Sequence, residues 1–184
     1  FNIFDGGQQT VAKLMQAGGY HTMMVGKWHL GSEPTGFNYW NILPGQGRYF
    51  DPILYDETGA RVYRGYATQV ITDIGIEALQ KRPKDKPFFL MLHHKAPHRE
   101  WEPDPVNKAK FANVTIPEPA SLRDNYATRP AALPENAQTV RNDLTRRDLK
   151  LPPPDGLSDP ERNKWLSEKP TSVEIEVDGA KKTL

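Results

Sequence analysis

Two stretches of the chain pair a helical apolar pattern with a run typical of a strand. From Tyr66 to Lys81, apolar side chains recur at helical spacing and predict an amphipathic helix. The run Phe88 to Leu92 (FFLML) that follows has no polar position, which predicts a strand covered on both faces by helices. The first of these elements therefore leads into the second as a helix-to-strand unit.

An earlier segment has the same order of elements. Gln8 to Ala17 is predicted to be a short helix, and Gly18 and Gly19 then supply a left-handed stop. Tyr20 to Val25 is predicted to be a strand, so that Lys27, Trp28 and His29 lie at or just past its end. In open α/β sheets this edge is where ligands bind.

The remaining chain is less regular. Gly36 to Asp51 is interpreted as a structured loop, whereas Pro52 to Tyr55 and Ala60 to Tyr63 are predicted to form a hairpin. Recurrent prolines after Glu102 predict an extended segment that wraps over a domain.

The tail begins with a stiff spacer, Leu151 to Gly156. Ser158 to Glu161 indicates the start of a brief helix near Trp165, and Val173 to Gly179 predicts an exposed strand without an obvious return strand. The predicted organisation is a core over residues 1–101, a proline-rich wrapping segment of the same domain over 102–150, and a spacer, helix and divergent tail over 151–184.

Composition excludes several functions. The 24 Lys and Arg residues nearly balance the 23 Asp and Glu residues and are scattered, so no nucleic-acid footprint is visible. The longest apolar run, Phe88 to Leu92, falls far short of the roughly 20 residues of a membrane-spanning helix. The absence of cysteine excludes disulfides and thiolate metal sites. The chain opens on Phe1 without a leader pattern, and we expect sequence upstream.

Candidate chemistry gathers just beyond the two predicted strands. Parallel strands would deliver these groups to one edge, where ammonium and imidazole groups suit a tetrahedral oxyanion such as sulfate or phosphate. Surface placement is the simpler alternative, and a zinc site is disfavoured because adjacent histidines point to opposite sides of a strand. The residues concerned are Lys27, His29, His93, His94, Lys95 and His98.

Three segments carry a family resemblance. Gly19 to Leu30 (GYHTMMVGKWHL) resembles the second signature of type I sulfatases, and Pro87 to Leu92 followed by Ala96 to His98 is similar to the strand and histidine loop of that family. Gly36 to Gly47 and the helix containing Ile71 look like the N-acetylglucosamine-6-sulfatase branch. The resemblance covers roughly residues 4–165 and implies an incomplete alkaline-phosphatase-like α/β fold, a three-layer sandwich with a mixed, mostly parallel sheet and flanking helices.

The resemblance also implies roles for individual residues. Lys27 would hold a sulfate oxygen, His29 would act as a base, and His98 would contact the sulfate and help protonate the departing sugar oxygen. Gln46, Arg48 and Tyr49 are candidates for a sugar subsite, as are Arg99 by charge and Trp101 by stacking.

The family pattern is incomplete in this chain. Its formylglycine nucleophile needs a Cys/Ser-x-Pro-Ser/Ala-Arg motif, and the nearest imitation, Ser32 to Gly36, ends in glycine and lies on the wrong side of Lys27. The acidic pairs that bind calcium and the second lysine of the family site are also missing. We therefore expect calcium and formylglycine only in a full-length enzyme, no metal site in this chain, and negligible turnover by the chain alone.

The sequence is compatible with three alternatives. A phosphoester or phosphonate hydrolase of the same superfamily would bind a similar oxyanion, and a non-catalytic module could bind sulfated glycans. A gene remnant without function is the third alternative. The expected partners are a sulfated saccharide and the missing segments of the fold, and the expected location is periplasmic or secreted, or lysosomal in a eukaryote.

Overall fold

The computed structural model of the chain consists of two compact units, Phe1–Asp104 and Pro105–Leu184. It describes residues 3–117, 119–136, 143–172, 174–177 and 180–183. Within the described residues, no helix combines the length and the apolar character that crossing a membrane requires.

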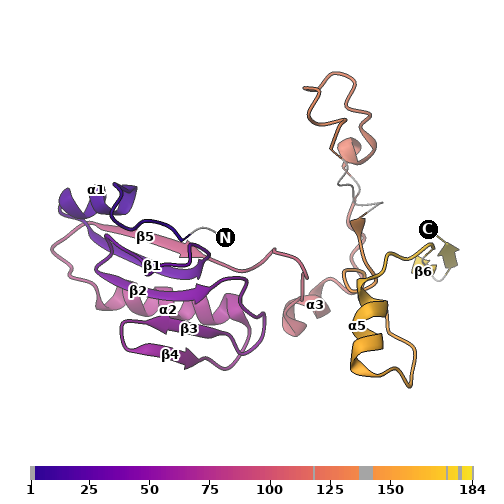
Figure 1. Cartoon of the computed structure of the whole chain (residues 1–184), viewed down its shortest axis with the longest axis horizontal. Helices are drawn as coiled ribbons and strands as arrows, with labels where there is room; N and C mark the ends of the chain where they lie inside the picture. Colours follow the sequence, from indigo (N-terminus) through magenta and orange to yellow (C-terminus); the bar gives the residue numbers. More distant parts are fainter. Residues whose placement is uncertain (1–2, 118, 137–142, 173, 178–179, 184) are drawn as a thin grey trace. The chain divides into compact units, whose positions relative to one another are not determined.

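The first unit is built on a five-stranded mixed sheet (Figure 1). Its strand order is β4-β3-β2-β1-β5, in which β1 pairs in parallel with both β2 and β5. The β2–β3 and β3–β4 pairings are antiparallel. The strands are β1 (His21–Trp28), β2 (Tyr39–Pro44), β3 (Ile53–Asp56), β4 (Gly59–Val62) and β5 (Phe88–His93).

Two helices accompany this sheet. In α1 (Val11–Ala17) the side chain of Thr10 accepts a hydrogen bond from the Lys13 N–H, which satisfies one of the free donors at the helix start. In α2 (Ala67–Lys81) the apolar stripe predicted from the sequence is buried. The predicted α/β class with a mixed sheet and flanking helices is confirmed.

Successive residues of the central strands serve different faces of the sheet, as strand geometry requires. One core cluster joins Val25 of β1, Leu43 of β2 and Leu54 of β3 to the buried side chains of α2. A second cluster contains their neighbours Met24 and Ile42 together with Trp40. Both faces of β1 and β2 are therefore buried, and these two strands hold the carboxyl edge of the sheet in place.

Three sequence-based expectations for secondary structure are wrong. The stretch from Gly36 to Asp51 contains the central strand β2, because Trp40 to Leu43 are buried between neighbouring strands. The run of β5 is not covered on both faces: it lies at the edge of the sheet, with Phe88 44% and Leu92 37% exposed. Finally, β6 (Glu174–Val177) has a return strand, β7 (Ala180–Thr183), which pairs with it antiparallel.

The second unit contains α3 (Pro105–Lys110), the 3-10 helix η1 (Ala120–Arg123) and α5 (Asp159–Ser167), besides the β6–β7 ribbon. The predicted helix near Trp165 is confirmed as α5, which begins with a capping box between Ser158 and Glu161. The predicted domain division and the wrapping of residues 102–150 over a domain stay predictions.

Candidate functional site

The carboxyl ends of β1 and β5 lie side by side, with Gly26 paired to His93. Gly26 has φ +101°, and a Cβ at this position would lie 2.0 Å from the carbonyl oxygen of His93. Only glycine permits this approach of the two backbones. Beyond it, Nδ1 of His93 lies 3.3 Å from the carbonyl oxygen of Lys27, so the ring ties the two strand ends together.

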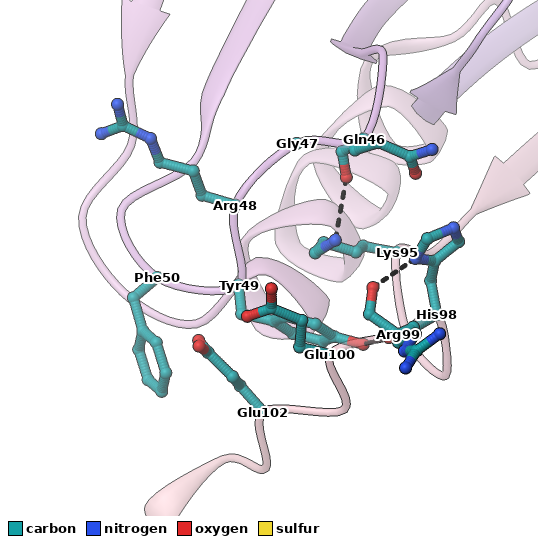
Figure 2. A pocket seen from close by; sticks show the side chains of 10 residues that line it. All are labelled: Gln46, Gly47, Arg48, Tyr49, Phe50, Lys95, His98, Arg99, Glu100 and Glu102. Carbon is teal, nitrogen blue, oxygen red and sulfur yellow. Dashed lines mark hydrogen bonds between the residues drawn. The ribbon is translucent and has the colours of Figure 1, made fainter. Parts of the chain in front are cut away.

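A pocket of about 460 Å³ opens beside these strand ends (Figure 2). Two segments supply its wall: the loop that follows β2, and the segment that follows β5. Its lining residues are Gln46, Gly47, Arg48, Tyr49, Phe50, Lys95, His98, Arg99, Glu100 and Glu102.

The loop after β2 reaches Lys27 through one side chain. The Lys27 ammonium donates a hydrogen bond to Oε1 of Gln46 over 2.9 Å. Gly47 has φ +64°, and a Cβ there would lie 2.4 Å from the Leu43 side chain, so the loop turns back tightly over β2. The half-buried Lys27 thus meets the rim of the pocket through Gln46.

Lys95 is buried beneath the same loop. Its side chain is 6% exposed and donates a hydrogen bond to the carbonyl oxygen of Gln46 over 2.9 Å (Figure 2). The ammonium also lies 4.5 Å from the centre of the Tyr49 ring. Burial lowers the pKa of Lys95, and the positive charge of Lys27 lowers it further, whereas the carboxylates of Glu100 and Glu102 act in the opposite direction.

The side chain of His98 is exposed and lines the pocket, and its backbone is fixed by a contact with the loop after β2. The hydroxyl of Tyr49 donates a hydrogen bond to the carbonyl oxygen of His98. The His98 ring meets the carbonyl oxygen of Arg99 through Nδ1 (Figure 2). Because a carbonyl oxygen only accepts, this contact requires a proton on Nδ1 and leaves Nε2 as the second reactive nitrogen.

Of the other predicted site residues, Arg48 and Arg99 line the pocket, whereas Trp101 and His29 do not. Arg48 lines the pocket but its guanidinium points away from Lys95 in Figure 2. The Arg99 guanidinium lies 6.0 Å from the ring centre of Trp101, which is 42% exposed and does not line the pocket. His29 follows β1 directly, is half-buried, and does not line the pocket either. The structure therefore brings Lys27 and His98 to one loop, with His29 beside that edge.

Sequence reasoning grouped Lys95 with the histidines but predicted no role for it. Its burial, and its contacts with Gln46 and Tyr49, make it part of the site. Glu100 and Glu102 also line the pocket and were missed, because they lie between β5 and α3 in a segment without a regular element whose period could have pointed to them. The neighbouring His94 is half-buried, and burial lowers the pKa of its ring.

The site does not fit a resident metal ion. Among the described residues, no group of three or more His, Asp or Glu side chains is arranged to hold one. The sequence also contains no cysteine, so thiolate ligands and a cysteine-derived nucleophile are excluded from these 184 residues.

Comparison with known proteins identifies the relatives of this arrangement. The profile of the sulfatase family matches residues 3–148. An N-acetylglucosamine-6-O-sulfatase of Bacteroides thetaiotaomicron is 48% identical over 154 residues, which is 82% of this chain and 28% of that protein. An N-acetylglucosamine-6-sulfatase of Capra hircus is 29% identical over 114 residues, which is 54% of this chain and 20% of that protein.

A solved structure shows the same fold. The structure of BT4656 in complex with its substrate D-glucosamine-2-N,6-O-disulfate matches with a TM-score of 0.68 and 41% identity, covering 92% of this chain and 36% of that one. The chain thus spans between about a fifth and about a third of the length of these relatives.

Proposed function

The chain belongs to the sulfatase family, and we propose that it supplies one side of an active site that hydrolyses sulfate esters on N-acetylglucosamine or a related sugar. The relatives named for this activity, and the substrate-bound neighbour, support the sugar class. We propose from the family alone that the full protein acts in the periplasm or outside the cell, or in the lysosome if its source is a eukaryote.

The observation that carries the proposal is the convergence of Lys27 and His98 on a single loop. Lys27 reaches it through the side chain of Gln46, and His98 is bound to it by the hydroxyl of Tyr49. Lys27 lies in β1 and His98 follows the parallel strand β5, so their approach to one loop depends on the pairing of these strands and not on the linear motif alone.

The chemistry of each group follows from its contacts. The Lys27 ammonium can exchange the neutral amide oxygen of Gln46 for an anionic sulfate oxygen and thereby form a stronger, charge-assisted hydrogen bond. With Nδ1–H of His98 donating to the Arg99 carbonyl, Nε2 is the nitrogen left to meet the departing sugar oxygen, and it delivers a proton there from the doubly protonated imidazolium form of the ring, which returns to the neutral Nδ1-protonated form. His29 is proposed to act as a base beside the same strand end.

Calcium and formylglycine are the cofactor and nucleophile of this family, and the described residues do not fit either. We propose that segments outside these 184 residues supply both groups, and that the chain alone has negligible turnover.

Binding tests the proposal directly. Isothermal titration calorimetry of the 184-residue chain with N-acetylglucosamine 6-sulfate should show saturable binding, and unsulfated N-acetylglucosamine should not bind. Lys27→Ala should weaken binding about tenfold or more, since hydrogen bonds to charged groups contribute about 1.5–3 kcal/mol. Lys84→Ala removes an exposed lysine that lies outside the pocket and is the matched control. Equal affinity of the two variants would refute the proposal.

A segment exchange tests turnover. Residues 3–148 replace the aligned segment of the Bacteroides relative, which then supplies the remaining parts of the site. The hybrid should release sulfate from the 6-sulfated sugar, and Lys27→Ala should abolish the release. Release of phosphate from the corresponding phosphate ester at a higher rate would favour a phosphoester hydrolase instead.

A further inference from the structure

Lys95 is an unusual lysine for its position in the fold. Among the side chains that the structure describes, it is the one charged group that is buried, at 6% exposure. Burying an ammonium group is costly unless it is paired, and Lys95 has one carbonyl oxygen and one aromatic face as its closest partners. A methionine of similar length would fill the space without this cost.

Both contacts of Lys95 lie on the loop that follows β2, and each leads on to a proposed reactive group. The first contact fixes the backbone of Gln46, whose side chain accepts the hydrogen bond from Lys27. The second fixes the ring of Tyr49, whose hydroxyl holds the backbone of His98. Lys95 is therefore the common point of two chains of contacts.

The alternative role, simple packing, explains these contacts less well. The Tyr49 ring already stacks on Tyr66, with ring centres 6.0 Å apart, so packing alone does not need a cation beside it. Lys27 and Lys95 both donate hydrogen bonds to Gln46, to its side-chain and its backbone oxygen respectively. Burial lowers the pKa of Lys95 most, and the like charge of Lys27 lowers it further, against the carboxylates of Glu100 and Glu102. Two ammonium groups are thus kept near one another at a cost, which suits a site that receives an anion.

We propose that Lys95 is a positioning residue of the sulfate-ester site: it holds the Gln46–Tyr49 loop so that Lys27 and His98 face the same anion. This inference rests on the proposed function for the identity of that anion. Lys95 acts through Gln46 and Tyr49, and its own contact with the substrate is not required.

The test uses three variants of the 184-residue chain. Lys95→Met removes the ammonium but keeps the length of the side chain, and Tyr49→Phe keeps the ring beneath Lys95 but releases the His98 carbonyl. Lys13→Met is the matched control, because the Lys13 ammonium also binds loop carbonyls, those of Gly6 and Gln8, away from the pocket. Circular dichroism establishes that each variant is folded.

Two measurements separate positioning from general stability. Nitrogen-15 NMR of the histidine rings reports the tautomer of His98, and this measurement needs no ligand. Calorimetry reports the dissociation constant for N-acetylglucosamine 6-sulfate. We expect Lys95→Met and Tyr49→Phe to move His98 from the Nδ1-protonated form toward a mixture of tautomers. Lys95→Met should also weaken binding about tenfold. Lys13→Met should change neither quantity.

The outcomes are distinguishable. The positioning role is overturned if Lys95→Met leaves the His98 tautomers unchanged and binds the sulfated sugar within about twofold of the wild-type affinity. In that case Lys27→Ala still tests the proposed function separately. If the wild-type chain does not bind the sulfated sugar, the proposed function fails, and the positioning role as stated fails with it. If Lys95→Met is unfolded, Tyr49→Phe decides, and unchanged tautomers and affinity in that variant overturn the inference.

Discussion

The close approach of β1 and β5 can be broken by a single methyl group. In Gly26→Ala the added Cβ would lie 2.0 Å from the carbonyl oxygen of His93, 2.8 Å from its carbonyl carbon and 3.1 Å from Cγ2 of Ile71. Two of these neighbours are backbone atoms of an adjacent strand, so the strands must move apart. The φ of +101° adds backbone strain for any residue with a side chain.

A matched glycine separates the two effects. Gly59 has φ +117°, but a Cβ added there would have no heavy atom within 4 Å, so Gly59→Ala introduces the strain without the overlap. Backbone strain at this φ costs about 1–3 kcal/mol, and the stiffer unfolded chain of the alanine variant offsets about 0.4–1 kcal/mol of it. Gly59→Ala should therefore lower the free energy of unfolding by about 1 kcal/mol. Overlap in a packed region costs about 1–3 kcal/mol more, so Gly26→Ala should lose about 2–4 kcal/mol.

Urea unfolding measures this difference. In a Trp165→Phe background, the remaining tryptophans all lie in the first unit, and the buried Trp40 reports the unfolding of its sheet. The free energy of unfolding of Gly26→Ala should fall about 1–3 kcal/mol below that of Gly59→Ala. A gap smaller than about 0.5 kcal/mol would refute the proposed steric constraint at the strand ends.

Two further predictions concern the surface of the first unit. A hydrogen bond from the Gly65 N–H, and then the Arg64 guanidinium, lower the pKa of Asp51, so the stability that this carboxylate contributes is present above its ordinary pKa of 3.8 and is lost as the pH falls through the lower pKa of the folded state. In Asp51→Asn, the free energy of unfolding should therefore fall less steeply as the pH drops below 3.8. An identical pH dependence in the variant and the wild type would contradict this assignment. Phe88→Glu places a charge on the exposed edge strand β5, near the Arg82 guanidinium, and should reduce self-association in dynamic light scattering, whereas unchanged particle size would show that this edge is not what associates.

The fold was predictable where the sequence has a clear period or turn chemistry. The stripe from Ala67 to Ala78 predicted α2, and Glu57 to Gly59 predicted the hairpin of β3 and β4. The strand β2 could not be recognised because it is short, contains the polar Asn41, and lies in a stretch whose glycine and proline residues are typical of turns. The return strand β7 was missed because Lys181 and Lys182 give it no apolar signal.

The site was predictable only in part, because motif spacing locates strand ends but not burial. The spacing predicted Lys27 and His98 at the carboxyl edge, and the structure has both in contact with the loop after β2, beside the paired strands β1 and β5. The importance of Lys95 depends on its burial beneath the loop from Gln46 to Tyr49, and no local pattern reports which of several neighbouring cations is covered.

The hydrogen bond between Lys27 and Gln46 has a consequence for discrimination among ligands. An incoming molecule gains only the difference between its own oxygen and the amide oxygen it displaces. A neutral sugar hydroxyl offers little more than that amide and gains almost nothing, whereas a charged oxygen gains a charge-assisted bond. If Lys27 receives the anion as proposed, the Gln46 amide disfavours uncharged saccharides at this position and admits charged ones.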